Sequence, residues 1–203
     1  MAGLKVTTLG GEPLSAEGAR IVEYLEIRTA DLTPQAIRDR VRTSAAQFEA
    51  AAAAVSEEQA RAHPIAGKWS IAEIVDHVAQ TQIRSAEELR HLVAGRRPPL
   101  PPVYEGLRSG APDFAPWSEL LEGLRAADNE VVAVLDAALN SPERPQATVE
   151  AVVVVNRALP GGGLAPQRFV MELGWREYGL FCRMHLMDHG KQIKRLRAAA
   201  AGA

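Results

Sequence analysis

The stretch "GLFCRMHLMDHGKQIKRL", from Gly179 to Leu196, decides how this chain folds. Its apolar residues recur every three or four positions, which predicts an amphipathic helix. Two histidines, His185 and His189, stand four positions apart, and side chains at this spacing leave the same face of a helix. The other residues of that face are typical of a protein core. The stretch therefore indicates a helix that buries two imidazoles one turn apart.

Three more long helices follow from the spacing of apolar residues. Thr33 supplies a hydroxyl N-cap and Pro34 follows it, which is a strong helix start. Ser70 and Glu73 form a capping box at the start of the next helix. The four predicted helices span residues 34–55, 70–93, 117–139 and 168–197. Four long amphipathic helices predict an all-α fold, a four-helix bundle.

Long connections rich in proline and glycine separate these helices. Residues 95–116 show no periodicity, and a loop of this length often forms a lid or a partner surface. The β-branched run 152–155 suits a short strand, and the glycine triplet 161–163 suits a turn. Before the first helix, residues 4–9 suit a strand and residues 15–28 a helix. The domains that we expect are an N-terminal extension over 1–30, the bundle over 31–198 and a frayed tail over 199–203.

The composition excludes several classes of function. The 203 residues are 47% hydrophobic and 24% charged, and the net charge is −2, so we expect no attraction to nucleic acid or to anionic membranes. No apolar run approaches the roughly 20 residues that span a bilayer. Cys182 is the only cysteine, so no intrachain disulfide can form. Because the N-terminus also lacks the pattern of a signal peptide, we expect a cytoplasmic protein.

The histidine face of the helix over 168–197 suggests a metal site. A buried imidazole needs a partner, because an unsatisfied buried polar group costs about 1–3 kcal/mol. Two such rings close together can share a divalent metal ion, although histidines at this spacing also occur in helices without one. A third ligand should come from another helix. His77, at the edge of the apolar stripe of the helix over 70–93, is the best candidate.

The sequence around these histidines resembles the DinB-like family, also known as DinB/YfiT-like proteins. The stretch "GKWSIAEIVDHVA" is similar to the family's tryptophan-led entry to its second helix, and "HLMDHGKQI" is similar to its HxxxHxxQ(I/L) pattern. The resemblance implies an up-down-down-up bundle, usually a homodimer. It also implies a divalent metal ion, of which Zn²⁺ or Ni²⁺ is expected, held by His77, His185 and His189. By the same pattern, Gln192 is expected to orient a ligand ring or a loop.

A site with three histidine ligands leaves a coordination position open. A metal ion there can lower the pKa of water from about 15.7 to about 7, or convert a thiol into a thiolate. The three histidines alone do not choose between a hydrolase and a small-thiol transferase or isomerase. Some members of the family activate a small thiol, which implies a small-molecule substrate and a low-molecular-weight thiol partner. Two alternatives stay open: a non-catalytic ligand- or partner-binding bundle with a structural or absent metal, and a stress-linked dimer whose 95–116 loop docks another chain.

Two charged residues are candidates for a direct part in catalysis. Glu73, one turn before His77, is a candidate general base or a carboxylate behind the ligands; its alternative role is the capping box. Arg84, two turns after His77, is a candidate for holding an anionic group of the substrate. Its alternative role is that of a solvated surface arginine. Cys182 is interpreted as a small apolar core residue.

Overall fold

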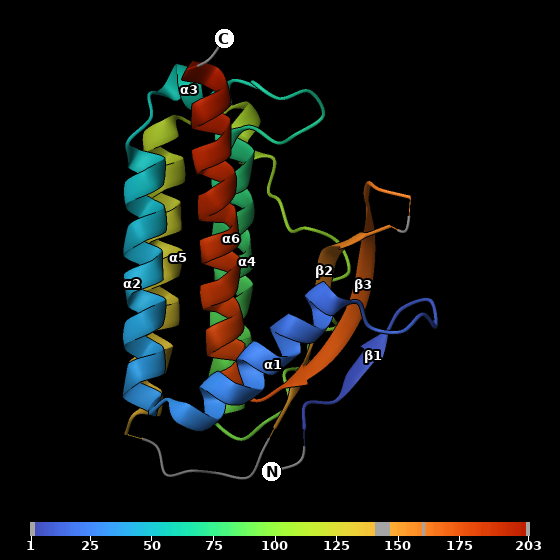
Figure 1. The fold of residues 1–203 in the computed structure, drawn as a ribbon. Helices are drawn as coiled ribbons and strands as arrows, with labels where there is room; N and C mark the ends of the chain where they lie inside the picture. Colours follow the sequence, from blue (N-terminus) through green and yellow to red (C-terminus); the bar gives the residue numbers. More distant parts are fainter. Residues whose placement is uncertain (1–2, 141–146, 160, 202–203) are drawn as a thin grey trace.

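The computed structural model describes residues 3–140, 147–159 and 161–201. Its long helices stand side by side in Figure 1: α2 (Pro34–Ala53), α4 (Ile71–Val93), α5 (Trp117–Ala138) and α6 (Trp175–Ala201). Helix α2 contacts α5 and α6, and α4 contacts the same two helices, so the four form a bundle. Helices α4 and α5 run opposite to α2 and α6, which is the up-down-down-up order.

Helices α2 and α4 start where the sequence places them. The Thr33 hydroxyl accepts a hydrogen bond from the backbone N–H of Ala36 before Pro34 opens α2. Ser70 and Glu73 form both halves of the predicted capping box at the start of α4. Both caps satisfy backbone N–H donors that have no partner within the first helical turn. Two short helices, α3 (Glu57–Arg61) and the 3-10 helix η1 (Ala111–Asp113), lie in the connections.

The prediction of an all-α fold is wrong, because a small antiparallel sheet accompanies the bundle. Its strands are β1 (Val6–Thr8), β2 (Val149–Ala158) and β3 (Leu164–Leu173), in the order β1-β3-β2. The predicted strand at 152–155 is confirmed within the longer β2. Strand β3 takes the first residues of the helix predicted over 168–197. Phe169, Met171 and Leu173 alternate inward along it and are fully buried, which is the period of a strand.

The start and end of the last helix therefore both differ from the prediction. Helix α6 begins at Trp175, directly after Gly174, and continues to Ala201, past the predicted end at residue 197. Pairing with β2, for example Val153 opposite Phe169, decides the conformation of β3. Residues 202–203 of the expected tail lie outside the described residues.

The N-terminal residues contribute a strand and a helix, as their sequence predicts. Strand β1 pairs with β3, so that Val6 lies opposite Met171. Helix α1 (Ala16–Asp31), capped by Ser15, contacts both α6 and β2. Figure 1 shows α1 crossing the lower part of the bundle obliquely toward the sheet. Its Leu25 is fully buried in the core.

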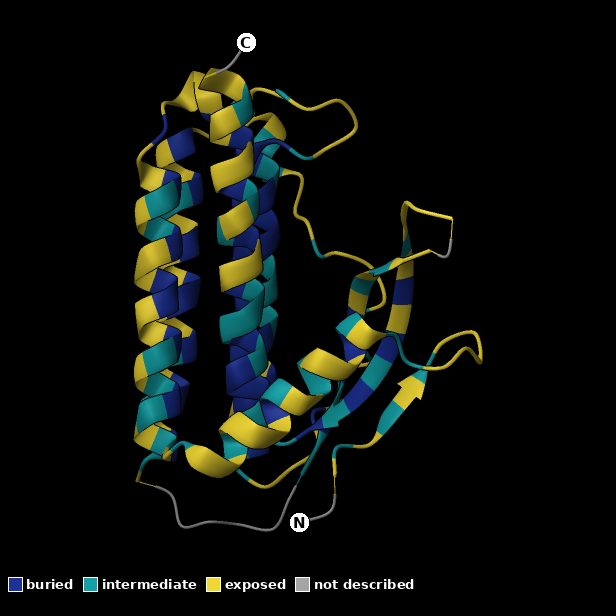
Figure 2. Ribbon diagram, in the orientation of Figure 1, coloured by how far each residue is buried: buried dark blue, intermediate teal, exposed yellow. Residues whose placement is uncertain are grey.

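The core follows the inward faces of the long helices, which are dark blue in Figure 2. One cluster of buried side chains joins the bundle to the sheet, and it includes Leu25, Phe169 and Leu180. A second cluster lies along the opposite part of the bundle and includes Phe48 and Ile74. Among the described residues, no helix combines the length and the apolar character that crossing a membrane requires.

Candidate metal centre

Three imidazole rings converge between α4 and α6. The Nε2 atom of His77 lies 3.1 Å from Nε2 of His185, which lies 3.0 Å from Nε2 of His189. One ligand atom from each ring lies within 4.8 Å of the other two. His77 and His189 are buried and His185 is half-buried. The predicted meeting of three nitrogen donors from two helices is confirmed.

Hydrogen bonds fix the orientation of two of the rings. His77 Nδ1 lies 2.9 Å from the carbonyl oxygen of Leu107, and His189 Nδ1 lies 3.1 Å from Oε1 of Gln192. Because both oxygens can only accept, each Nδ1 carries the proton and donates it. The lone pair of each Nε2 then faces the centre of the cluster. Among the described residues, Nδ1 of His185 is buried without a hydrogen-bond partner.

Burial favours the neutral form of all three imidazoles. Removal from water lowers the pKa of His77, although the hydrogen bond to the Leu107 carbonyl acts in the opposite direction. Burial also lowers the pKa of His185 well below its ordinary value, and charge repulsion from His189 and His77 adds to this. The pKa of His189 falls to about 4, first through burial and then through His77. Neutral imidazole is the form that binds a metal ion.

The arrangement fits a divalent metal ion. Ligand nitrogens about 2.0–2.1 Å from a tetrahedral Zn²⁺ lie about 3.3 Å from one another. The two Nε2 pairs that include His185 are close to this distance, at 3.0 and 3.1 Å. His77 and His189 hold their protons on Nδ1, so only His185 can supply a proton to the centre. One proton cannot form good hydrogen bonds to two acceptors on different sides. A cation at the centre would satisfy all three lone pairs.

Backbone from the long connection between α4 and α5 forms one wall of the cluster. The ring of Trp69 lies 5.1 Å from that of His77, measured between centroids. A Cβ atom at Gly106 would lie 3.2 Å from Cη2 of Trp69 and 3.5 Å from Cε1 of His77. Glycine therefore lets the chain pass close to both rings. In the sequence, only the unusual length of the loop over 95–116 indicated that this connection has a special role.

Glu73 is engaged by partners at the start of α4. Its Oε2 accepts a hydrogen bond from the Ser70 N–H at 2.8 Å, and its Oε1 accepts one from Nη1 of Arg108 at 3.1 Å. Among the described residues, no hydrogen bond joins its carboxylate to His77. The capping role is thus confirmed, and the role of general base stays a prediction.

Arg84 belongs to a buried polar network two to three turns along α4 from His77. Its Nε donates to Oε1 of Glu88 at 2.6 Å, and its Nη2 donates to the carbonyl of Pro101 at 2.6 Å. The Tyr178 hydroxyl donates to the other oxygen of Glu88 and lies 3.2 Å from Oγ of Ser85. Burial raises the pKa of Tyr178 well above its ordinary value, so the phenol stays neutral. Tyr178 thus adds no charge to the network, and the buried carboxylate of Glu88 compensates the charge of Arg84.

A cavity of about 640 Å³ links the histidine cluster to this network. Its walls come from α4, α6, α1, β2 and residues 103–107, and both His77 and Arg84 line it. Much of the wall is apolar and includes Val103, Val152, Phe181 and Met184. Strand β2 was predicted, but its place beside the histidines was not.

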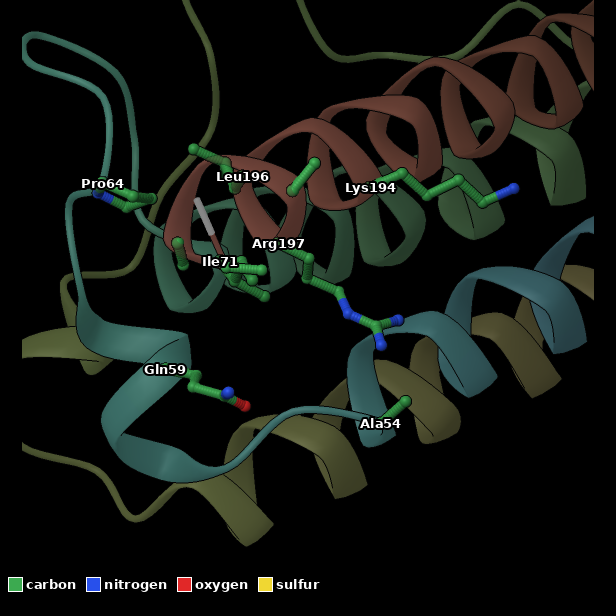
Figure 3. Close-up of a pocket in the computed structure, with 10 residues that line it drawn as sticks. Ala54, Gln59, Pro64, Ile71, Lys194, Leu196 and Arg197 are labelled. Carbon is green, nitrogen blue, oxygen red and sulfur yellow. The ribbon is translucent and has the colours of Figure 1, made fainter. Parts of the chain in front are cut away.

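A second cavity, of about 460 Å³, lies near the C-terminal end of α6 (Figure 3). Ile71 and Leu196 give it an apolar lining, and Lys194 and Arg197 contribute positive charge. The described residues that line it include no histidine, cysteine or carboxylate. It therefore offers no ligands for a metal ion, in contrast to the cavity beside the histidines.

The family model described as the DinB superfamily matches residues 40–193. The chain belongs to the DinB superfamily. The match spans α4, which carries His77, and the part of α6 that carries His185 and His189. A search of curated proteins finds no match for this DinB-superfamily chain.

Two solved structures are similar to this DinB-superfamily chain. Both are of the mycothiol-dependent maleylpyruvate isomerase, the second being a mutant, with 16% and 15% sequence identity and a TM-score of 0.43 in each case. The similarity covers 80% of this chain but only 61% of each of those chains.

Proposed function

We propose that this protein is a metal-dependent enzyme that acts on a small molecule, with Zn²⁺ or Ni²⁺ held by His77, His185 and His189. The observation that carries the proposal is the convergence of three Nε2 atoms in the wall of a cavity of about 640 Å³. Closed structural zinc sites normally have four protein ligands, whereas catalytic sites commonly have three. A three-ligand site that faces a cavity supports a catalytic centre.

The metal supplies one kind of chemistry at such a site: it lowers the pKa of a water or a thiol that it binds, as hydrolysis or thiol transfer requires. The protein's own residues orient the ligands. Leu107 and Gln192 hold the proton of His77 and His189 on Nδ1 and keep Nε2 free. Burial raises the pKa of the Cys182 thiol to about 12, so this residue supplies no thiolate of its own. A thiol used in the reaction would come from outside the chain.

The walls of the cavity support a substrate with an apolar body and an anionic group. Val103, Val152 and Phe181 offer an apolar surface that displaces water. Arg84 and Arg183 both line the cavity. Glu88 neutralises the first, whereas Arg183 donates to the Tyr24 hydroxyl at 2.7 Å and has no carboxylate partner among the described ion pairs. We therefore assign the binding of an anionic group to Arg183 in preference to Arg84.

A reaction screen of the metal-loaded protein tests the proposal. Low-molecular-weight thiols are offered with small electrophiles and isomerisable carboxylates, and esters are offered without a thiol. Turnover that disappears in His77→Ala supports an enzyme, and the need for a thiol separates transfer from hydrolysis. Tight metal binding without turnover or thiol binding would instead support the non-catalytic bundle. With Co²⁺ in the site, a thiolate-to-metal absorption band reports thiol binding directly.

A further inference from the structure

The wall segment, residues 106–109, is held against the first turns of α4 by side chains that the proposed chemistry does not use. The main contact is made by the carboxylate of Asp76, a buried residue that is 3% exposed. Its Oδ2 accepts a hydrogen bond from the backbone N–H of Ser109 at 2.8 Å, and its Oδ1 accepts one from the Ser109 hydroxyl at 2.5 Å. Thirty-three positions separate the two residues in the chain. A charged group is seldom buried without such partners.

Arg108 makes a second contact between the wall segment and the start of α4. The guanidinium of Arg108 donates to Glu73 at 3.1 Å and lies 5.2 Å from the ring centroid of Trp69. Gly106 packs against the same tryptophan ring. Arg108 is half exposed, with 47% of its side chain accessible. Exposed ion pairs of this kind contribute little, so the buried Asp76 contact is the stronger of the two.

The wall segment carries the acceptor that orients His77. The Leu107 carbonyl, two residues before Ser109, receives the Nδ1 proton of His77 at 2.9 Å. The other oriented ring, His189, uses Gln192 on its own helix, three residues away. The orientation of His77 thus depends on a loop that must be held in place, whereas that of His189 does not.

We infer that Asp76 is a positioning residue, which holds Ser109 so that the Leu107 carbonyl keeps His77 with its proton on Nδ1 and its Nε2 directed to the centre. The inference rests on the proposed metal site for its consequence, because hydrogen-bond partners of ligand histidines change metal affinity by about 10- to 100-fold. It does not depend on the metal for the orientation itself. The two parts can therefore be tested separately.

The first test measures the tautomer of His77 in the metal-free protein by ¹⁵N NMR. The wild type is expected to show the proton on Nδ1. Asp76→Ala and Ser109→Ala are expected to show a mixture of His77 tautomers. Ser109→Thr keeps the hydroxyl and is expected to give the same spectrum as the wild type. Ser109→Ala keeps the test available if Asp76→Ala does not fold. An unchanged His77 tautomer in the folded alanine variants would overturn the inference.

The second test measures the dissociation constant for Zn²⁺ by competition with a chromophoric chelator. The matched control is Asp188→Asn. Asp188 adjoins His189 as Asp76 adjoins His77 and is exposed, and asparagine removes its charge but keeps an oxygen for the Gln192 amide 3.5 Å away. We expect the constant to rise about tenfold in Asp76→Ala and to change less than about threefold in Asp188→Asn. Equal changes in the two variants would mean that charge alone acts, and would overturn positioning. If the wild type bound no Zn²⁺, the proposed function would fail, and the tautomer measurement would still decide the inference.

Discussion

Nε2 of His77 and Nε2 of His185 lie 3.1 Å apart although 108 positions separate the two residues in the chain. The contact exists because α4 and α6 pack against each other in the bundle. Hydrogen bonds turn the Nε2 atoms of His77 and His189 inward, and burial lowers the pKa of all three imidazoles. The three rings therefore present neutral nitrogen donors to one point, as a metal site requires.

The first prediction concerns the buried pair of Arg84 and Glu88. Arg84→Gln is expected to lower the free energy of unfolding by about 2–4 kcal/mol, because Glu88 would keep a buried negative charge without the guanidinium that compensates it. Urea denaturation at pH 7 measures the change. The double variant Arg84→Gln/Glu88→Gln should recover most of the loss, since it removes both charges. A fully stable Arg84→Gln would show that Arg84 acts as a solvated residue.

The second prediction concerns Asp128, a residue of α5 that is 2% exposed. Burial raises its pKa from 3.8 to about 7, while the hydrogen bond from Gln82 opposes the shift. Between these values the folded protein holds a proton that the unfolded chain releases. The free energy of unfolding should therefore fall as the pH rises from about 4 to about 7.

The matched variant for this second prediction is Asp128→Asn, which keeps an oxygen for Gln82 and cannot ionise. We expect the variant to be more stable than the wild type by about 1–3 kcal/mol at pH 8, and to lose this part of the pH dependence. Denaturation of both proteins at pH 4, 6 and 8 measures the difference. Parallel stability profiles for the two proteins would contradict a raised pKa.

A third prediction tests the strand that replaces the start of the expected helix. Phe169 is fully buried on β3 and lies opposite Val153 of β2. Phe169→Ala should destabilise the protein by about 3–5 kcal/mol, as truncation of a buried phenylalanine usually does. The control is Arg168→Ala, at an exposed position of the same strand. Similar losses from both substitutions would argue against this packing of the sheet.

The fourth prediction concerns the close passage of the chain at Gly106. Gly106→Leu should weaken Zn²⁺ binding about tenfold, because its side chain must displace Trp69 or the wall that orients His77. The midpoint of thermal unfolding should change little, since residue 106 is exposed. Gly123→Leu, where an added Cβ meets nothing within 4 Å, is the control. Undiminished Zn²⁺ affinity in Gly106→Leu would show that the wall does not matter.

Local signals explain why much of this molecule could be predicted from its sequence. The caps at Thr33 and Ser70 are short-range patterns, and so is the spacing of His185 and His189. His77 was predictable because a polar residue beside an apolar helical stripe is conspicuous. These features depend on residues that lie within one or two turns of each other.

The features that escaped prediction depend on distant partners. Residues 168–173 read as the start of a helix until β2 supplies a strand beside them. The Leu107 carbonyl orients His77, but a backbone oxygen leaves no signature in a sequence. Asp76 and Ser109 meet across 33 positions, and the place of β2 beside the histidines follows from the fold as a whole.

Metal analysis of the protein purified without a histidine tag tests the central claim most directly. After incubation with Zn²⁺ or Ni²⁺ and removal of the excess, elemental analysis should find about one metal ion per chain. His185→Ala, which removes the nitrogen that lies 3.0 and 3.1 Å from its two neighbours, should leave almost none. A wild-type protein that stays metal-free after this treatment, or a His185→Ala variant that retains a full equivalent, would contradict a three-histidine centre.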